Sequence, residues 1–249
     1  MAGRLKDKVA VVTGAARGIG LAVATAYAKE GAIVFAVDVL EKELSSAMQA
    51  LAAGGHAAQA LAADISQETE VKRVFDRVHG AHPCVDVLAN VAGIIVLEPV
   101  ERTTAEIWDR TLGVNLRGAF LCVRAVVPGM KQARRGSIIS TSSNAGIVGY
   151  PNETAYCASK FGIEGLSRAL TKELTPFGIA VNSITPGTPM RTEMSVIALN
   201  AEQKSRWQDP AVISPAYVHL AMQDASGITD QYVNAWEMSE DLRSKGWAT

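Results

Sequence analysis

The sequence predicts one α/β domain of the doubly wound kind, with a parallel sheet of about seven strands covered by helices on both faces. Short apolar runs rich in β-branched residues alternate with helix-like segments along the chain. That alternation is typical of strand–helix–strand units around a buried parallel sheet. No Pro/Gly/Ser-rich linker or change of composition divides the 249 residues, and 48% are hydrophobic. We therefore expect residues 1–249 to form a single domain with a large core.

Each expected strand is a short apolar run that ends in polar or glycine-rich residues. A run of valines predicts the first strand at 8–13, and the segment 21–29 beyond the next glycines reads as a helix. The second strand, 32–38, ends in Asp38, and the third, 57–63, ends before Asp64. Further strands are expected at 85–90, 136–142, 179–184 and about 228–234.

A glycine-rich turn, Thr13-Gly14-Ala15-Ala16-Arg17-Gly18-Ile19-Gly20, joins the first strand to the first helix. Its glycines permit a tight turn and let backbone N–H groups approach a pyrophosphate at the helix N-terminus. Asp38 follows Gly20 by eighteen residues, close to the spacing at which a carboxylate reaches the ribose hydroxyls of a dinucleotide. These features predict a dinucleotide site. We interpret Asp38 as favouring NAD, because a carboxylate repels the 2′-phosphate of NADP. Arg17 points the other way, because a cation in this turn could face the 2′-phosphate of NADP. We interpret Arg17 as a solvated loop residue and give Asp38 more weight.

Tyr156 and Lys160 are four residues apart, and Ser143 precedes the tyrosine by thirteen residues. On a helix, positions i and i+4 share one face. A free tyrosine has a pKa near ~10 and is a poor base at neutral pH. We expect Lys160 to stabilise the phenolate and lower the pKa of Tyr156, which would make it usable as an acid or base. Alone, such a pair would be an ordinary surface feature, but the glycine-rich turn favours a catalytic interpretation.

These motifs resemble the short-chain dehydrogenase/reductase family, from about Lys6 to about Val233. The turn has the family's T-G-x-x-x-G-x-G spacing, and the resemblance implies a Rossmann fold. The other matching residues are Asp64 and Ile65 at the adenine ring, Asn90 and Gly93 in a segment similar to N-N-A-G, Asn115 in a helix, and Pro186-Gly187 at the nicotinamide.

The resemblance implies roles for four residues. Tyr156 would exchange the proton of the alcohol, and Lys160 would lower its pKa and bind the nicotinamide ribose. Ser143 would hold the substrate oxygen, and Asn115 would hold a water that connects Lys160 to solvent. Ser142 competes for the role of Ser143, but the spacing favours Ser143. The hydride passes directly between the substrate and the cofactor, so the protein supplies positioning and proton transfer.

Three places depart from the family pattern. Val91 replaces the second asparagine of N-N-A-G. The loop after Gly187 carries its later threonine one residue late, so either Thr188 or Thr192 could contact the nicotinamide, and we favour Thr188. Residues 234–237 replace D-G-G, which puts the usual subunit packing in doubt. We expect 188–215 to form a substrate lid, and the tail 238–249 either to cover a neighbouring subunit or to be solvated.

Composition limits the classes of partner. The net charge is −1 and the cations are scattered, so neither nucleic acid nor an anionic membrane is an expected partner. We see no apolar run near eighteen residues and no secretory segment. Three separated cysteines indicate reduced thiols, and the cytoplasm is the expected location. Four histidines show no metal-ligand spacing, so no metal is expected.

The favoured function is an NAD-dependent oxidoreductase that interconverts a secondary alcohol and its ketone, the alcohol being a sugar, a polyol or a cyclic alcohol. One alternative is a 3-oxoacyl-carrier-protein reductase, whose acidic carrier could meet Arg134, Arg135 and Lys172. Another is a non-catalytic dinucleotide-sensing protein, which would be expected to lose the four candidate catalytic residues. The resemblance also implies a homotetramer, paired through long helices around 101–130 and 154–175, with a dimer as the second possibility.

Overall fold

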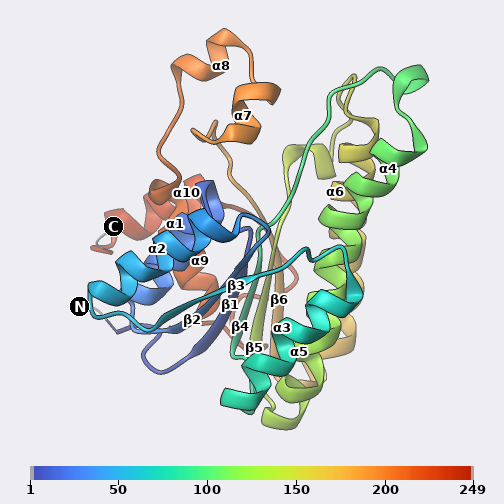
Figure 1. Ribbon diagram of the computed structural model, residues 1–249. Coiled ribbons are helices and arrows are strands. Elements are labelled where there is room, and N and C mark those ends of the chain that lie inside the picture. The colour runs from blue at the N-terminus through green and yellow to red at the C-terminus, as the bar shows by residue number, and fades with distance from the viewer. Residues whose placement is uncertain (1–2, 248–249) are drawn as a thin grey trace.

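The computed structural model, described over residues 3–247, has a parallel seven-stranded sheet between two layers of helices (Figure 1). The strand order is β3-β2-β1-β4-β5-β6-β7, which confirms the predicted doubly wound Rossmann fold. All seven expected strands are present, although the last is shorter than expected. The strands are β1 (Val9–Thr13), β2 (Ile33–Asp38), β3 (Ala58–Ala62), β4 (Val87–Asn90), β5 (Gly136–Thr141), β6 (Ile179–Thr185) and β7 (Tyr232–Asn234).

Helices cover both faces of the sheet because its strands are apolar on both sides. In Figure 1, α1, α2, α9 and α10 lie on one side, and α3, α5 and α6 on the other. The helices are α1 (Gly18–Lys29), α2 (Glu41–Ala53), α3 (Glu68–Ala81), α4 (Ala105–Leu112), α5 (Ala119–Ala133), α6 (Thr154–Leu174), α7 (Glu193–Ala198), α8 (Ala201–Ser205), α9 (Ser214–Ala221) and α10 (Ala235–Ser244).

Two hydrophobic cores result from this arrangement, one on each face. Alternate residues of a strand point to opposite faces, so Val12 contributes to the core with Tyr27 and Tyr217. Its neighbour Val11 belongs to the other core, with Leu174. The strands are thereby fixed from both sides, and the loops at their carboxyl ends have a rigid base.

The strand order reverses between β1 and β4, since the chain runs outward to β3 on one side and to β7 on the other. In open parallel sheets, ligands bind in the crevice outside the carboxyl ends of the strands at such a reversal. The loops after β1, β4 and β5 all lead out from this edge. Figure 1 shows α7 and α8 standing above it, opposite the loops that lead into α4 and α6.

The carboxyl-terminal tail folds back onto its own domain. Helix α10 begins after Asn234, whose side chain accepts a hydrogen bond from the Glu237 N–H at 3.2 Å. Leu242 is buried, and the Trp247 ring meets His219 of α9 edge-on, 5.4 Å between centroids. The described part of the tail therefore packs on its own domain and is only partly solvated, and its contact with a neighbouring subunit stays a prediction. Residues 248 and 249 lie outside the described chain.

One continuous helical stretch, Ala105–Ala133, is long and apolar enough to cross a membrane by length and composition alone. It passes by its average hydropathy, since charged and polar residues interrupt its apolar ones and it contains no continuous apolar run near eighteen residues. The stretch combines α4, a π-helical turn at Gly113–Gly118 and α5. Its buried side chains include Leu121 and Val126, which belong to the core against the sheet. Core helices of soluble proteins pass the same test, so this single stretch is weak evidence for a membrane span.

Candidate functional site

The glycine-rich turn after β1 packs so closely that its glycines cannot carry side chains. A Cβ on Gly14 would lie 2.7 Å from the Cα of Ala92, and one on Gly20 would lie 2.0 Å from the carbonyl oxygen of Gly14. Gly14 and Gly18 also have positive φ angles, of 68° and 56°. In the described chain no side chain caps α1 and its first turn holds no acid. The N–H groups at its start can therefore receive a pyrophosphate, which fits the predicted dinucleotide.

Asp38, the last residue of β2, lies beside this turn. Its carboxylate accepts hydrogen bonds from the backbone N–H of Ala16 and of Leu40, both at 3.0 Å. These contacts hold a negative charge next to the start of α1. Arg17, the cation of the same turn, forms an exposed ion pair with Glu193 of α7 at 3.5 Å. Arg17 is thus not simply solvated, as the sequence suggested, but connects the turn to the segment beyond β6.

The loop after β4 is held by Thr13 at the end of β1. Its hydroxyl oxygen accepts hydrogen bonds from the N–H groups of Val91 and Ala92, at 3.0 and 3.2 Å. The replacement of asparagine by Val91 therefore leaves the loop anchored through its backbone. Asn90 is buried, and its side-chain oxygen has no hydrogen-bond partner among the described residues. A Cβ on Gly93 would lie 3.4 Å from the Asn115 side-chain oxygen.

Asp64 and Ile65 follow β3 at the same edge but differ in surroundings. The half-buried Asp64 carboxylate accepts a hydrogen bond from the Ser66 N–H at 2.9 Å. The Ile65 side chain is buried against Gly118, where an added Cβ would come within 2.8 Å of it. Its side chain therefore positions the π-helical turn.

Tyr156 and Lys160 share one face of α6, as their spacing predicts, and both are buried, at 8% and 4% exposure. The Lys160 ammonium donates a hydrogen bond to the Thr141 carbonyl oxygen at 2.7 Å and lies 5.6 Å from the centre of the Tyr156 ring. Ser143 follows β5, and its hydroxyl is hydrogen-bonded to that of Tyr156. Ser142 is buried below, against Gly146. The structure thus places Ser143, rather than Ser142, beside the tyrosine.

Asn115 lies in the π-helical turn between α4 and α5, a distortion frequent at functional sites. Its side chain pairs with the backbone of Ile94, accepting a hydrogen bond at 2.8 Å and donating one at 2.9 Å. It also donates to the Ser159 hydroxyl at 3.0 Å. Asn115 therefore joins the loop after β4 to α6, close to Lys160.

The electrostatics of the pair differ from the sequence expectation. Burial raises the pKa of Tyr156 to about 12, and the hydrogen bond with Ser143 opposes this only in part. Burial also lowers the pKa of Lys160 to about 8, while the negative charge of Glu164 raises it. In the cofactor-free chain, removal of Tyr156 from water thus raises its pKa, opposite to the expected direction, and the lowering of that pKa by Lys160 stays a prediction for the chain with its cofactor bound.

The segment after β6 lies against the glycine-rich turn. Thr192 caps α7 by accepting a hydrogen bond from the Ser195 N–H at 3.2 Å, and its methyl group would lie 3.2 Å from a Cβ on Gly18. Thr188 is half-buried, and its hydroxyl has no hydrogen bond to another residue in the range 3–247. Of the two candidate threonines, Thr188 is thus the one whose hydroxyl is available to contact the nicotinamide. Met194 packs against the small cluster formed by Ala145, Tyr156 and Cys157.

Comparisons with known proteins show the family to which the chain belongs. A family model described as short chain dehydrogenase matches residues 8–203. A cyclopentanol dehydrogenase from Comamonas sp. is 38% identical over 221 residues, covering 89% of this chain and 86% of the relative. A D-threitol dehydrogenase from Mycolicibacterium smegmatis is 38% identical over 235 residues, covering 90% of each.

The chain belongs to the short-chain dehydrogenase/reductase family. Among solved structures, a candidate NAD(P)-dependent gluconate 5-dehydrogenase from Beutenbergia cavernae, with bound NADP, superposes with a TM-score of 0.86. It is 31% identical, and the match covers 94% of this chain and 98% of the other. Relatives thus act on alcohols and bind NAD(P), so the protein is an oxidoreductase of this family that acts on CH–OH groups.

Sequence reasoning missed several residues of this short-chain dehydrogenase/reductase site. The Thr141 carbonyl oxygen accepts a hydrogen bond from Lys160, and the Ser159 hydroxyl accepts one from Asn115. Ser159 could have been found from its place on the same helix as Tyr156. Glu164 continues the i, i+4 spacing of Tyr156 and Lys160 and is 6% exposed, so helical periodicity could have identified it. Ile95 has no signal in the sequence, because only the fold brings it to the cluster that contains Tyr156.

Proposed function

We propose that this chain is an NAD-dependent oxidoreductase that interconverts a small secondary alcohol and its ketone. The observation that carries the proposal is the gathering of Ser143, Tyr156, Lys160 and Asn115 at the edge of the sheet where the glycine-rich turn lies. Tyr156 would accept the hydroxyl proton in oxidation, and Ser143 would hold the substrate oxygen. NAD would supply the hydride acceptor. A screen of alcohols and ketones with NAD(H) and NADP(H), followed through the absorbance of the reduced cofactor, tests it.

Residues 188–215 are proposed as the substrate lid, and Thr188 as its contact to the nicotinamide. Met194 packs against the cluster that contains Tyr156, and Glu193 forms an ion pair with Arg17. Both contacts support a lid that closes over the substrate and the cofactor. Neither alternative function is favoured by the surroundings. Arg134 donates to the Pro176 carbonyl oxygen and Arg135 pairs with Asp86, so two of the three cations suggested for an acidic carrier have partners within this chain.

Cofactor choice should depend on Asp38. We expect the wild type to use NAD with a far higher kcat/KM than NADP, and Asp38→Ala to narrow the difference by removing a negative charge that repels the 2′-phosphate. Steady-state kinetics with both cofactors measure the ratio. Glu41→Ala, which removes a nearby acid from the start of α2, is the matched control. Equal efficiency with NAD and NADP in the wild type would refute the assignment.

The pH dependence of kcat/KM should shift when the negative charge of Glu164 is removed. Oxidation needs the Tyr156–Lys160 pair to accept a proton, so kcat/KM should rise with pH and level off above the apparent pKa of the pair, near the value of about 8 for Lys160. Glu164 raises that pKa, so in Glu164→Gln the plateau should begin about half to one pH unit lower. Ser183→Ala removes the hydrogen bond to Glu164 at 2.8 Å but keeps the charge, and serves as the control. An unchanged pH profile in Glu164→Gln would contradict this prediction.

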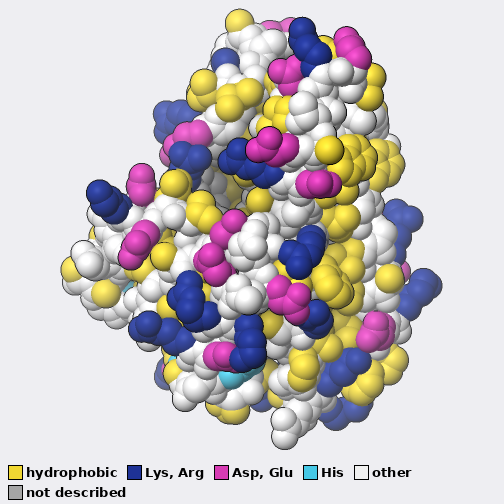
Figure 2. All heavy atoms as spheres, turned by 45° about the vertical axis from the view of Figure 1, so that its right-hand side comes forward, with side chains coloured by type: hydrophobic (Ala, Val, Ile, Leu, Met, Phe, Trp, Pro, Cys, Tyr) yellow, Lys and Arg dark blue, Asp and Glu magenta, His cyan; other side chains and the backbone are white. Residues whose placement is uncertain are grey.

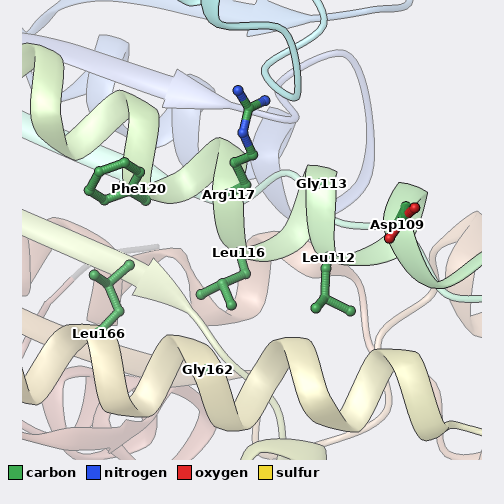
Figure 3. A pocket seen from close by; sticks show the side chains of 8 residues that line it. All are labelled: Asp109, Leu112, Gly113, Leu116, Arg117, Phe120, Gly162 and Leu166. Atoms are coloured by element: carbon green, nitrogen blue, oxygen red, sulfur yellow. The ribbon is translucent and has the colours of Figure 1, made fainter.

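A homotetramer is the proposed assembly, with a dimer as the second possibility. The outer face of α4, α5 and α6 carries a groove of about 700 Å³ (Figure 3), and apolar side chains gather along this face (Figure 2). Phe120 and Phe161 are 43% and 48% exposed. We expect light scattering to find an oligomer, and Phe161→Glu to lower its mass, because a buried charge opposes association. Val196→Glu on α7 is the control. A wild-type monomer at micromolar concentration would refute both assemblies.

The cytoplasm remains the proposed location. The three cysteines, at 84, 122 and 157, are buried and free in the structure. Thiols in this state are typical of reducing compartments.

A further inference from the structure

The proposed substrate lid is joined to the domain by two chain connections that pair with each other. The first, residues 186–191, leaves β6, and the second, residues 208–213, leads into α9. The Arg191 N–H donates to the Gln208 carbonyl oxygen at 2.8 Å, and the Gln208 N–H donates to the Pro189 carbonyl oxygen at 2.9 Å. Helices α7 and α8 lie between these connections along the chain and above them in Figure 1. The two connections therefore form a common base for the lid.

Helix α10 holds the first connection. The Trp236 N–H, in the first turn of α10, donates to the Pro186 carbonyl oxygen at 3.2 Å. Gly187 has a φ of 78°, and a Cβ placed on it would lie 1.8 Å from the Asn234 side-chain oxygen. The same oxygen caps α10 by accepting a hydrogen bond from the Glu237 N–H at 3.2 Å. Asn234 thus fits against the backbone of Gly187, where only glycine leaves room for it, and joins the start of α10 to the base of the lid.

The same helix also holds the second connection. Near the end of α10, the Arg243 guanidinium donates a hydrogen bond to the Val212 carbonyl oxygen at 2.7 Å. The Arg243 side chain is 24% exposed, so this charge-assisted hydrogen bond is partly shielded from water. Just beyond the connection, the buried Ser239 hydroxyl accepts a hydrogen bond from the Ala216 N–H of α9 at 3.1 Å. Helix α10 therefore contacts the chain at both ends of the lid.

We propose that α10 holds the base of the lid, with Asn234 and Arg243 as positioning residues that keep α7 over the cofactor and the substrate. The inference rests on the proposed function of the lid and adds the residues that set its position. Helix α7 pairs with the glycine-rich turn through Glu193 and packs against the cluster of the candidate catalytic tyrosine through Met194. Opening of the base breaks both contacts together, so the binding of NAD and of the alcohol should weaken by a similar factor.

Hydrogen exchange of the free protein, followed by mass spectrometry of short peptides, tests the base directly. The Arg191 and Gln208 N–H groups are hydrogen-bonded across the two connections, so they exchange when the base opens. Arg243→Met removes the hydrogen bond to Val212, and both groups should exchange about threefold to tenfold faster, as for the loss of one hydrogen bond. Lys245→Met removes an exposed cation that follows the same helix, and as the matched control it should leave both rates unchanged.

Steady-state kinetics test whether the base positions α7. In Arg243→Met the KM values for NAD and for the best alcohol should both rise by about threefold to tenfold, because a smaller fraction of the protein has α7 in place. The kcat should stay within about twofold, since the reaction proceeds in the same closed complex. Arg243→Lys keeps a donor for the Val212 carbonyl oxygen and should restore most of the wild-type values.

Asn234→Ser separates positioning from helix capping. Serine caps a helix about as well as asparagine, but its side chain is shorter and gives up the contact with Gly187. Both KM values should therefore rise in this variant, while Tm stays close to that of the wild type.

Unchanged exchange in Arg243→Met would overturn the inference. Faster exchange with unchanged KM values would also overturn it, because the base would then not position α7. Should no alcohol be oxidised, the proposed function fails, and exchange together with calorimetric titration of NAD then decides the inference. The Kd for NAD should rise by about threefold to tenfold in Arg243→Met.

Discussion

Tyr156→Phe should reduce kcat by about a hundredfold to ten-thousandfold, the range expected for loss of a general acid or base. Only one hydroxyl group is removed, so the fold and NAD binding should persist. No neighbour can replace it, because the Lys160 ammonium donates to the Thr141 carbonyl oxygen at 2.7 Å and the Ser143 hydroxyl is a far weaker base than a phenolate. Turnover of the best alcohol, together with calorimetric titration of NAD, measures both effects.

Two further variants show whether the loss of activity is specific to the Tyr156 hydroxyl. Tyr232→Phe removes a phenolic hydroxyl that lies 3.4 Å from the Asn144 side chain, and it should leave kcat nearly unchanged. Ser143→Ala should reduce kcat while NAD affinity stays close to that of the wild type, because Ser143 would contact the substrate oxygen. If Tyr156→Phe retained most of its activity, the assignment of the acid and base would be wrong.

Gly20→Ala should abolish tight NAD binding and destabilise the protein. The new Cβ would lie 2.0 Å from the Gly14 carbonyl oxygen and 2.6 Å from its carbon, and neither backbone atom can move without opening the turn. Overpacking of this kind costs about 1–3 kcal/mol. In a chain of this size that loss lowers Tm by roughly 2–4 °C per kcal/mol. Calorimetry of unfolding and titration with NAD provide the two measurements.

Gly80→Ala is the matched control for this substitution. Gly80 lies in α3, and apart from its chain neighbours and the backbone of its own helix, no described atom lies within 4 Å of a Cβ built there. The same methyl group should therefore raise stability by about 0.5–1 kcal/mol, through the lower entropy of the unfolded chain, and leave NAD affinity unchanged. A Gly20→Ala protein that binds NAD as tightly as the wild type would show that the turn is not the cofactor site.

Much of the fold was predictable because the necessary information is local. The apolar runs gave the strand positions, and the glycines at 14, 18 and 20 marked the tight turn, since a turn and its helix are contiguous in the chain. Helical spacing likewise placed Tyr156 and Lys160 on one face. The ends of the elements were less certain, and the last strand is only Tyr232–Asn234. The long helix expected around 101–130 corresponds to the helical stretch Ala105–Ala133, but the π-helical turn inside it has no local signal in the sequence.

The sequence by itself determined where the strands lie along the chain, the glycine-rich turn, the acid at the end of β2 and the spacing of the candidate catalytic residues. Only the tertiary structure decided the environment of those residues. It buried Tyr156 and Lys160 together, which reversed the expected shift of the tyrosine pKa. It also used Thr192 as the cap at the start of α7. Burial and hydrogen-bond partners depend on contacts between distant parts of the chain, and a pattern of neighbouring residues does not contain them.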